Sequence, residues 1–149
     1  HGVAFADLDR DGDLDLFEQM GGAYPGDGFG DTLFENPGFG NHWLALVLVG
    51  VSSNRNAIGA RIHAEFDENG TRRHVYRWVN SGCSFGCNPF EQHLGLGKAS
   101  EVARLEIWWP KSDTTQVFEH VAADQRLEIV EGASAPRVVS VPPFRFQAR

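Results

Sequence analysis

The residues best suited to chemistry are five aspartates that alternate along positions 7–15, in the run Asp-Leu-Asp-Arg-Asp-Gly-Asp-Leu-Asp. Like charges at this spacing repel one another unless a cation lies among them. Ca²⁺ binds about six to eight oxygen atoms, and a tight loop can supply them from the side chains at its first, third, fifth and ninth positions and from the carbonyl at its seventh. Gly12 tolerates the positive φ that a sharp turn needs. A solvated acidic turn is the alternative. The spacing predicts a calcium site formed by Asp7, Asp9, Asp11, Asp13 and Asp15.

The elements on either side of this loop decide between two kinds of calcium site. Counting Asp7 as position one places Glu18 at position twelve, which completes the EF-hand pattern. An EF-hand needs a helix on each side of the loop. Gly21, Gly22 and Pro25 would end an exit helix within about two turns, and residues 14–17 alternate in part like a strand. The sequence therefore favours a loop between two strands.

Cys83 and Cys87, the only two cysteines, offer a second kind of site. They could form a small-loop disulfide or a pair of soft metal ligands, or they could be two unrelated buried thiols. Two cysteines do not complete a zinc site, and the nearest histidine, His93, comes without a fourth ligand. We predict a disulfide, which implies an oxidising compartment.

Composition limits the class of protein. The 149 residues suit one domain, or one domain with a fragment of another, and 42% hydrophobic residues with 17 glycines indicate a turn-rich, all-β globular protein. The net charge of −7 argues against nucleic-acid binding and favours cations. No apolar run approaches the length of about 18 residues that a membrane span needs. The chain starts at His1 without an initiator methionine, as a mature or excised fragment does, so the missing signal peptide does not argue against secretion.

From residue 41 onward the pattern predicts a β-sandwich or small barrel. Residues 42–49 are apolar on both faces, which is typical of a central strand. Residues 60–66 alternate, and Asn69-Gly70 then predicts a hairpin turn. Further strands are expected at 72–79, 102–109, 115–119 and 127–130, a weak helix at 121–124, and Trp43 and Trp78 in the core.

Residues 2–16 resemble the FG-GAP (VCBS-type) repeat of β-propellers, as in integrin-like heads, because an apolar strand, the aspartate loop and a second strand follow one another. The resemblance implies that Asp7, Asp9, Asp11 and Asp15 bind calcium through side chains and Asp13 through its backbone, with Glu18 an ordinary strand residue. No second copy of the loop follows. Because a propeller needs several blades, this segment is expected to be a partial blade.

Residues 41–131 resemble the ASPIC/UnbV domain, which follows FG-GAP repeats in cartilage-acidic-protein-like proteins. The resemblance rests on several motifs in the right order: Asn41-His42-Trp43-Leu44, Ser53-Asn54-Arg55-Asn56-Ala57-Ile58-Gly59-Ala60-Arg61, Ser81-Gly82-Cys83-Ser84-Phe85-Gly86, His93-Leu94-Gly95-Leu96-Gly97, Leu105-Glu106-Ile107-Trp108-Trp109-Pro110 and Asp124-Gln125-Arg126-Leu127. The two cysteines and the run Trp109-Pro110-Lys111-Ser112-Asp113 depart from the family pattern. The resemblance implies secretion, calcium and β architecture, but no settled catalytic activity. It divides the chain into a partial repeat at 1–40, an ASPIC/UnbV-like domain at 41–132 and an extended arm at 133–149.

The remaining motifs favour structural roles. Residues 53–59 could recognise a sugar or a carboxylate, but a turn stabilised by asparagine is the better interpretation. His63 and His74 flank the hairpin, where we expect a satisfied surface pair rather than a metal site. No nucleophile elbow, phosphate loop or dinucleotide fingerprint occurs, so we expect no enzyme activity.

These observations predict a secreted, calcium-binding structural or interaction module that mediates extracellular protein–protein or adhesion contacts. One alternative is the subunit of an extracellular filament assembled by strand exchange, because an unpaired blade edge can accept a strand. The other is a carbohydrate-binding accessory domain. A protein partner or self-association is expected, with a glycan ligand as the alternative, and neither nucleic acid nor a membrane span is expected.

Overall fold

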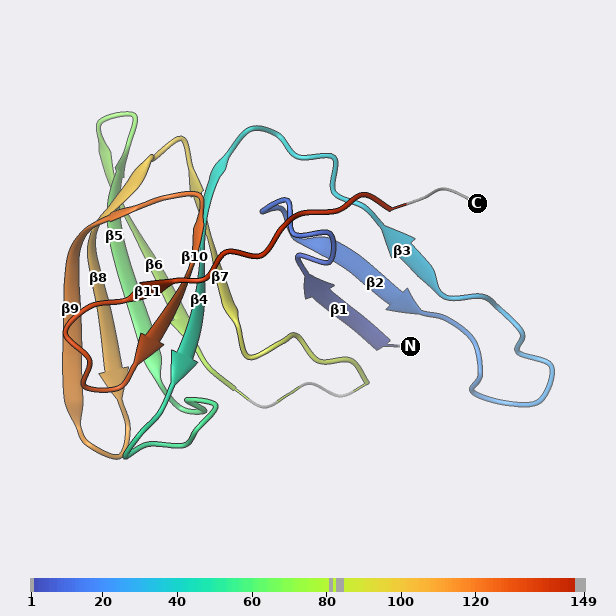
Figure 1. Ribbon diagram of the computed structural model, residues 1–149. Coiled ribbons are helices and arrows are strands. Elements are labelled where there is room, and N and C mark those ends of the chain that lie inside the picture. Colours follow the sequence, from blue (N-terminus) through green and yellow to red (C-terminus); the bar gives the residue numbers. More distant parts are fainter. Residues whose placement is uncertain (1, 81, 83–84, 147–149) are drawn as a thin grey trace. The chain divides into compact units, whose positions relative to one another are not determined.

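The computed structural model describes residues 2–80, 82 and 85–146. Within these residues the chain forms eleven β-strands in three sheets and no helix (Figure 1). The prediction of an all-β fold is confirmed. No helix suited to crossing a membrane occurs in the described part of the chain.

The chain divides into two compact units. The first contains residues 1–39, 81–89 and 141–149, and the second contains residues 40–80 and 90–140. Segments 81–89 and 141–149 thus belong with the aspartate loop, although both lie far from it in sequence.

The first unit is built on a three-stranded antiparallel sheet in the order β1-β2-β3. Its strands are β1 (Gly2–Ala6), β2 (Asp15–Gln19) and β3 (Thr32–Phe34). The aspartate loop connects β1 to β2, whose pairing runs from Gly2 opposite Gln19 to Ala6 opposite Asp15. The loop therefore lies between two paired strands, as predicted, and an EF-hand is excluded.

Two later segments of the same unit contact this sheet and its loop. The N–H of Phe5 donates to Asn88 Oδ1 at 2.9 Å. Gly86 lies against Val3 so closely that a Cβ on Gly86 would come within 2.4 Å of the Val3 carbonyl oxygen, so no larger residue fits there without a backbone shift. The N–H of Phe144 donates to the Asp9 carbonyl at 2.9 Å.

The second unit is a sandwich of two four-stranded sheets (Figure 1). One sheet has the order β11-β10-β4-β7 and contains β4 (His42–Val49), β7 (Gln92–Gly97), β10 (Gln125–Val130) and β11 (Arg137–Val138). β4 pairs parallel with β10 and antiparallel with β7, so the prediction that it is a central strand is confirmed. The two-residue strand β11 adds an edge from within the segment predicted as an arm.

The other sheet has the order β6-β5-β8-β9 and contains β5 (Arg61–Glu68), β6 (Thr71–Trp78), β8 (Glu101–Trp109) and β9 (Thr114–Ala122). Ile62, Ala64 and Phe66 of β5 face inward, with at most 2% of their surface exposed. They join Leu44, Leu46 and Leu127 of the facing sheet in one hydrophobic core. At the end of β5, Asn69 and Gly70 have φ of 50° and 79°, and the predicted hairpin turn is confirmed.

Two local predictions are wrong. Residues 121–122, predicted as the start of a short helix, continue strand β9, because Val121 and Ala122 pair with Val102 and Glu101 of β8. Trp78 is 56% exposed rather than buried, because it lies opposite Arg61 of β5 and so shares the outer face of the sheet, away from the core-facing Ile62. Trp43 is half-buried and stacks on His93 at 5.7 Å.

A buried carboxylate closes one end of the sandwich. Glu131 follows β10 and accepts hydrogen bonds at 2.7 Å from three successive backbone N–H groups, those of Val51, Ser52 and Ser53. The hydroxyls of Ser53 and Ser112 donate to its other oxygen, at 2.9 and 2.6 Å. Glu131 thereby ties the segment after β4 to the ends of two later strands.

The loop that Glu131 holds is a turn stabilised by asparagine, as predicted. Asn54 Oδ1 accepts the N–H of Asn56 at 3.0 Å, and the N–H of Ala57 donates to the Asn54 carbonyl at 2.7 Å.

Candidate metal centre

The aspartate loop is folded by its own side chains. Arg10 and Gly12 have φ of 67° and 101°, so the backbone reverses direction within a few residues. The two oxygens of Asp7 accept the N–H groups of Asp11 and Gly12, each at 3.1 Å. Asp11 Oδ1 accepts the N–H of Asp13 at 2.9 Å. These bonds orient the start of the loop around the Asp7 carboxylate.

Three of the predicted ligands converge. One carboxylate oxygen from each of Asp7, Asp9 and Asp15 lies within 4.8 Å of the other two. Asp9 and Asp15 are 3% and 1% exposed. Carboxylates this close and this buried repel one another strongly unless a cation compensates them.

Asp9 Oδ1 is the atom of the loop that most clearly needs a positively charged partner. It is buried and has no hydrogen-bond partner, and it is the one such side-chain atom among the described residues. An unpaired buried polar atom costs about 1–3 kcal/mol, and more when it is charged. A cation bound among the three carboxylates would remove this cost, so the residues present fit a metal ion.

The electrostatics of the loop agree with this geometry. Burial raises the pKa of Asp7 to about 6, assisted by the charge of Asp11 and opposed by hydrogen bonds from loop N–H groups, foremost that of Gly12. Burial also raises the pKa of Asp9, together with the charges of Asp11 and Asp15. In the described part of the chain, neither Asp7, Asp9 nor Asp15 forms an ion pair with a lysine or arginine.

Asp15 connects the loop to the segment after β3. As the first residue of β2, it accepts the Leu8 N–H through Oδ2 at 3.0 Å and the Asn36 N–H through Oδ1 at 2.9 Å. The Asn36 side chain donates to the Leu14 carbonyl at 3.3 Å. Asn36 therefore holds the second half of the loop in place.

An open pocket adjoins the loop within the same unit. Its lining includes Asp9, Asp11, Glu35 and Phe144. The negative charge of Glu35 also contributes to the raised pKa of Asp9. No sequence pattern points to Glu35, and the run Asn36-Pro37-Gly38 indicates only a turn. Glu35 and Asn36 contribute because the fold places them beside the loop, which their spacing in the sequence does not reveal.

The other predicted site residues lie outside the convergent group. Asp11 is exposed and bonds within the loop, as described above. The Asp13 carboxylate lies against the backbone of Gly38, 2.7 Å from the position that a Cβ would take. Their roles as fourth and fifth ligands stay predictions. Cys87 is exposed, but Cys83 lies outside the described residues, so the disulfide also stays a prediction.

Comparison with known families concerns the second unit. Residues 50–136 match the family described as ASPIC and UnbV. The chain belongs to this family. The match begins directly after β4 and includes strands β5–β10, so most of the ASPIC and UnbV segment is the sandwich. The aspartate loop lies outside it. No curated protein matches the chain.

Proposed function

We propose that this chain is a secreted, calcium-stabilised structural module that mediates protein–protein contacts outside the cell. The observation that carries the proposal is the buried Asp9 Oδ1 without a hydrogen-bond partner, on a carboxylate that converges with those of Asp7 and Asp15. Calcium is the best-suited cation because it accepts an all-oxygen, flexible ligand set at about 2.3–2.6 Å.

In this proposal calcium keeps the shape of the loop and does not switch it. The ends of the loop are fixed by the pairing of β1 with β2, so the loop has little room for a large movement. Asp7, Asp9 and Asp15 would hold the ion, with the Asp11 carboxylate and the Asp13 carbonyl completing its coordination. The bound ion would offset the mutual repulsion of the carboxylates and thereby stabilise the sheet.

The three-stranded sheet also supports a role in contacts. Residues directly opposite one another on paired strands share a face, so the register places Phe5 and Phe34 on one face and Phe17 and Leu33 on the other. These four side chains are 38–51% exposed. The hydrophobic core cluster of the described residues contains no member of this sheet.

A sheet that exposes apolar side chains on both faces is suited to packing between two others. We therefore propose that β1–β3 form a blade of the FG-GAP type, covered by further blades or by a protein partner. The proposed location outside the cell agrees with a single loop site, because extracellular modules use calcium sites with dissociation constants of about 10⁻⁴–10⁻³ M.

The calcium proposal is tested by thermal unfolding of the full chain in EGTA and in millimolar Ca²⁺. A ligand at concentration c that binds only the folded state stabilises it by RT ln(1 + c/Kd), which is about 1.4 kcal/mol when its concentration is ten times the dissociation constant. We expect the melting temperature to rise with Ca²⁺ in the wild type and not in Asp9→Asn. In EGTA, Asp9→Asn should be at least as stable as the wild type, because it removes one of three repelling charges.

Glu18→Gln is the matched control, because Glu18 would be a ligand in an EF-hand but is a strand residue here. This variant should keep the calcium response. The calcium site would be contradicted if millimolar Ca²⁺ left the melting temperature of the wild type unchanged. It would also be contradicted if Ca²⁺ raised the melting temperature of Asp9→Asn as much as that of the wild type.

A further inference from the structure

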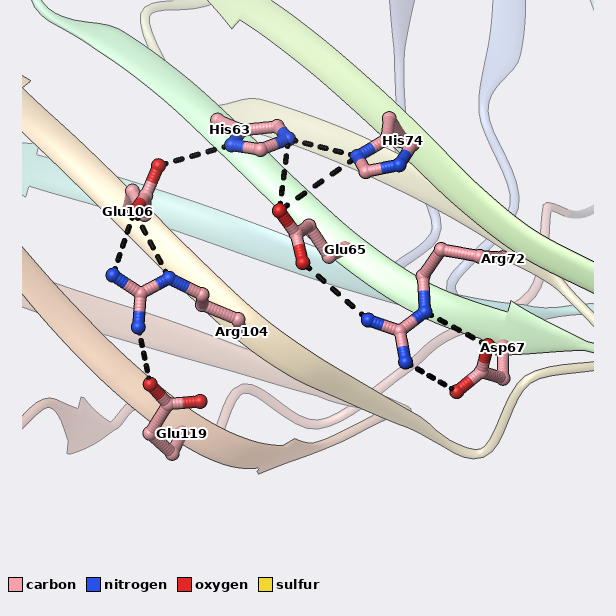
Figure 2. Close-up of polar contacts among 8 residues, drawn as sticks. All are labelled: His63, Glu65, Asp67, Arg72, His74, Arg104, Glu106 and Glu119. Carbon is pink, nitrogen blue, oxygen red and sulfur yellow. Dashed lines mark hydrogen bonds and ion pairs between the residues drawn. The ribbon is translucent and has the colours of Figure 1, made fainter.

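A cluster of histidines and carboxylates covers the outer face of the second sheet of the sandwich. The register of β5 places His63 opposite Tyr76 of β6 and Glu106 of β8, and Glu65 opposite His74 of β6. Successive side chains of a strand point to opposite faces, so these groups share the outer face while Ile62 and its neighbours of like parity face the core. Figure 2 shows the side chains of His63, Glu65, His74 and Glu106 pointing toward one another from three strands.

Three atoms of this cluster form a triangle of metal-ligand type. His63 Nε2 and His74 Nδ1 form a hydrogen bond at 3.1 Å, as expected of a surface pair, and a bound ion would replace the proton between them. Glu65 Oε1 lies 3.7 Å from His63 Nε2 and 3.8 Å from His74 Nδ1. Ligands bound at about 2.0–2.1 Å to a tetrahedral zinc ion lie about 3.3 Å from one another. Small side-chain adjustments bring the three atoms to that spacing.

The contacts of Glu65 leave this triangle open for a cation. Both distances from Glu65 Oε1 to the imidazole nitrogens are too long for a hydrogen bond. The other oxygen, Oε2, is engaged by Arg72 at 3.4 Å, and Arg72 is itself held by Asp67 at 2.8 Å. Arg72 thereby keeps Oε1 directed at the two nitrogens.

Glu106 sets the tautomer that a ligand histidine needs. Its Oε2 lies 3.0 Å from His63 Nδ1, and its Oε1 is bound by Arg104 at 2.8 Å. A carboxylate held by a guanidinium accepts hydrogen bonds at both oxygens, here from Arg104 at Oε1 and from His63 at Oε2. The proton of a neutral His63 therefore resides on Nδ1, and the lone pair of Nε2 points at His74 and Glu65.

The surroundings hold the cluster while leaving it accessible. The Tyr76 ring stacks on His63 at 4.5 Å with an interplanar angle of 3°, which restricts rotation of the imidazole. The side chains of His63, Glu65 and His74 are 20%, 23% and 44% exposed. An ion can enter from solvent and can keep a water molecule in its fourth position.

We propose that His63, Glu65 and His74 bind a divalent transition-metal ion, with zinc the best fit and Glu106 as the positioning residue for His63. Two imidazole nitrogens and one carboxylate oxygen suit zinc, copper or nickel and do not suit calcium. The arrangement of Glu106 behind His63 is the carboxylate–histidine–metal geometry that commonly orients a ligand histidine. This site is independent of the aspartate loop in residues and in donor type.

The test uses the full chain, stripped of metal with a chelator and titrated with ZnCl₂ by calorimetry and with Co²⁺ by visible absorption. We expect one ion per chain at this cluster, with cobalt bands of a four-coordinate nitrogen and oxygen site. His63→Ala and His74→Ala should each abolish this binding. Glu106→Gln should weaken it roughly 10- to 100-fold while leaving the cobalt bands in place.

Two controls distinguish this cluster from zinc binding elsewhere in the chain. His120 lies on β9 of the same sheet and contacts Glu101, outside the proposed site. The His120→Ala variant should therefore bind zinc as the wild type does. Asp9→Asn should also bind zinc normally, so failure of the calcium proposal leaves this one intact. No zinc binding by the wild type, or binding that persists in His63→Ala and His74→Ala, as it would at cysteine thiols, overturns the proposal.

Discussion

Glu131→Gln should destabilise the sandwich by about 3 kcal/mol at neutral pH. Burial alone would raise the pKa of Glu131, but hydrogen bonds from the Ser112 hydroxyl and from the N–H groups of Ser53 and Val51 outweigh it and lower the pKa from 4.5 to about 2. Each pKa unit corresponds to about 1.4 kcal/mol of preference for the charged form, which gives the figure of about 3 kcal/mol. Glutamine keeps the size of the side chain but loses the charge.

The pH dependence follows from the direction of this change. A carboxylate whose pKa is lower in the folded state stabilises the protein fully above its unfolded pKa of about 4.5, and this contribution is lost as the pH falls toward about 2. The difference in unfolding free energy between wild type and Glu131→Gln should therefore be largest above about pH 5.5 and shrink steadily between pH 4.5 and 2.

Urea unfolding followed by tryptophan fluorescence measures this difference. All four tryptophans lie in residues 43–109, within the second unit, so the signal reports the sandwich. Glu128→Gln is the control, because Glu128 forms a partly exposed ion pair with Arg137 at 2.9 Å. Such pairs contribute about 0–1 kcal/mol. A loss in Glu131→Gln below about 1 kcal/mol, or one that does not change with pH, would refute the reasoning.

Two further changes test the packing of the sandwich by the same unfolding assay. Gly50→Ala should lower the free energy of unfolding by about 1–3 kcal/mol, because the new Cβ would lie 2.1 Å from the Asn54 carbonyl oxygen and the turn must shift. An unchanged urea midpoint would contradict this close approach. Trp109→Ala should lower the free energy of unfolding by about 3–5 kcal/mol, since Trp109 is fully buried. Trp78 is exposed, so Trp78→Ala should have a far smaller effect. Equal losses in the two variants would contradict this difference in burial.

Patterns that depend on neighbouring residues predicted the fold well. The alternation of residues 60–66 identified the buried face of β5, and Asn69-Gly70 identified its hairpin. The apolar run at 42–49 identified a central strand. These signals are local, because the period of a strand and the φ of a turn are set within a few residues.

Features that depend on strand order were not predictable. Trp78 is apolar, but its exposure follows from its register opposite Arg61, which places it on the outer face of the sheet. Glu131 carries no local signal, because its three backbone partners lie about eighty residues earlier in the chain. The cluster of His63, Glu65, His74 and Glu106 depends on how β5 pairs with both β6 and β8. The sequence indicated only the hairpin that joins β5 to β6.

The candidate calcium site lies between these cases. Aspartate spacing located the loop, and the structure brings together Asp7, Asp9 and Asp15. The contribution of Asn36 from beyond β3 could not be predicted, because it depends on how the chain returns to the loop.

The parallel pairing of β4 with β10 has a consequence for how the sandwich folds. β4 is the first strand of this unit and among its most apolar, yet one of its two neighbours is β10, which follows almost all the other strands in sequence. Contacts between residues so far apart in sequence slow folding, since a long loop must close before they form. During synthesis, β4 therefore presents an unprotected apolar edge until nearly the whole unit has emerged, and this interval is when the chain is most exposed to aggregation.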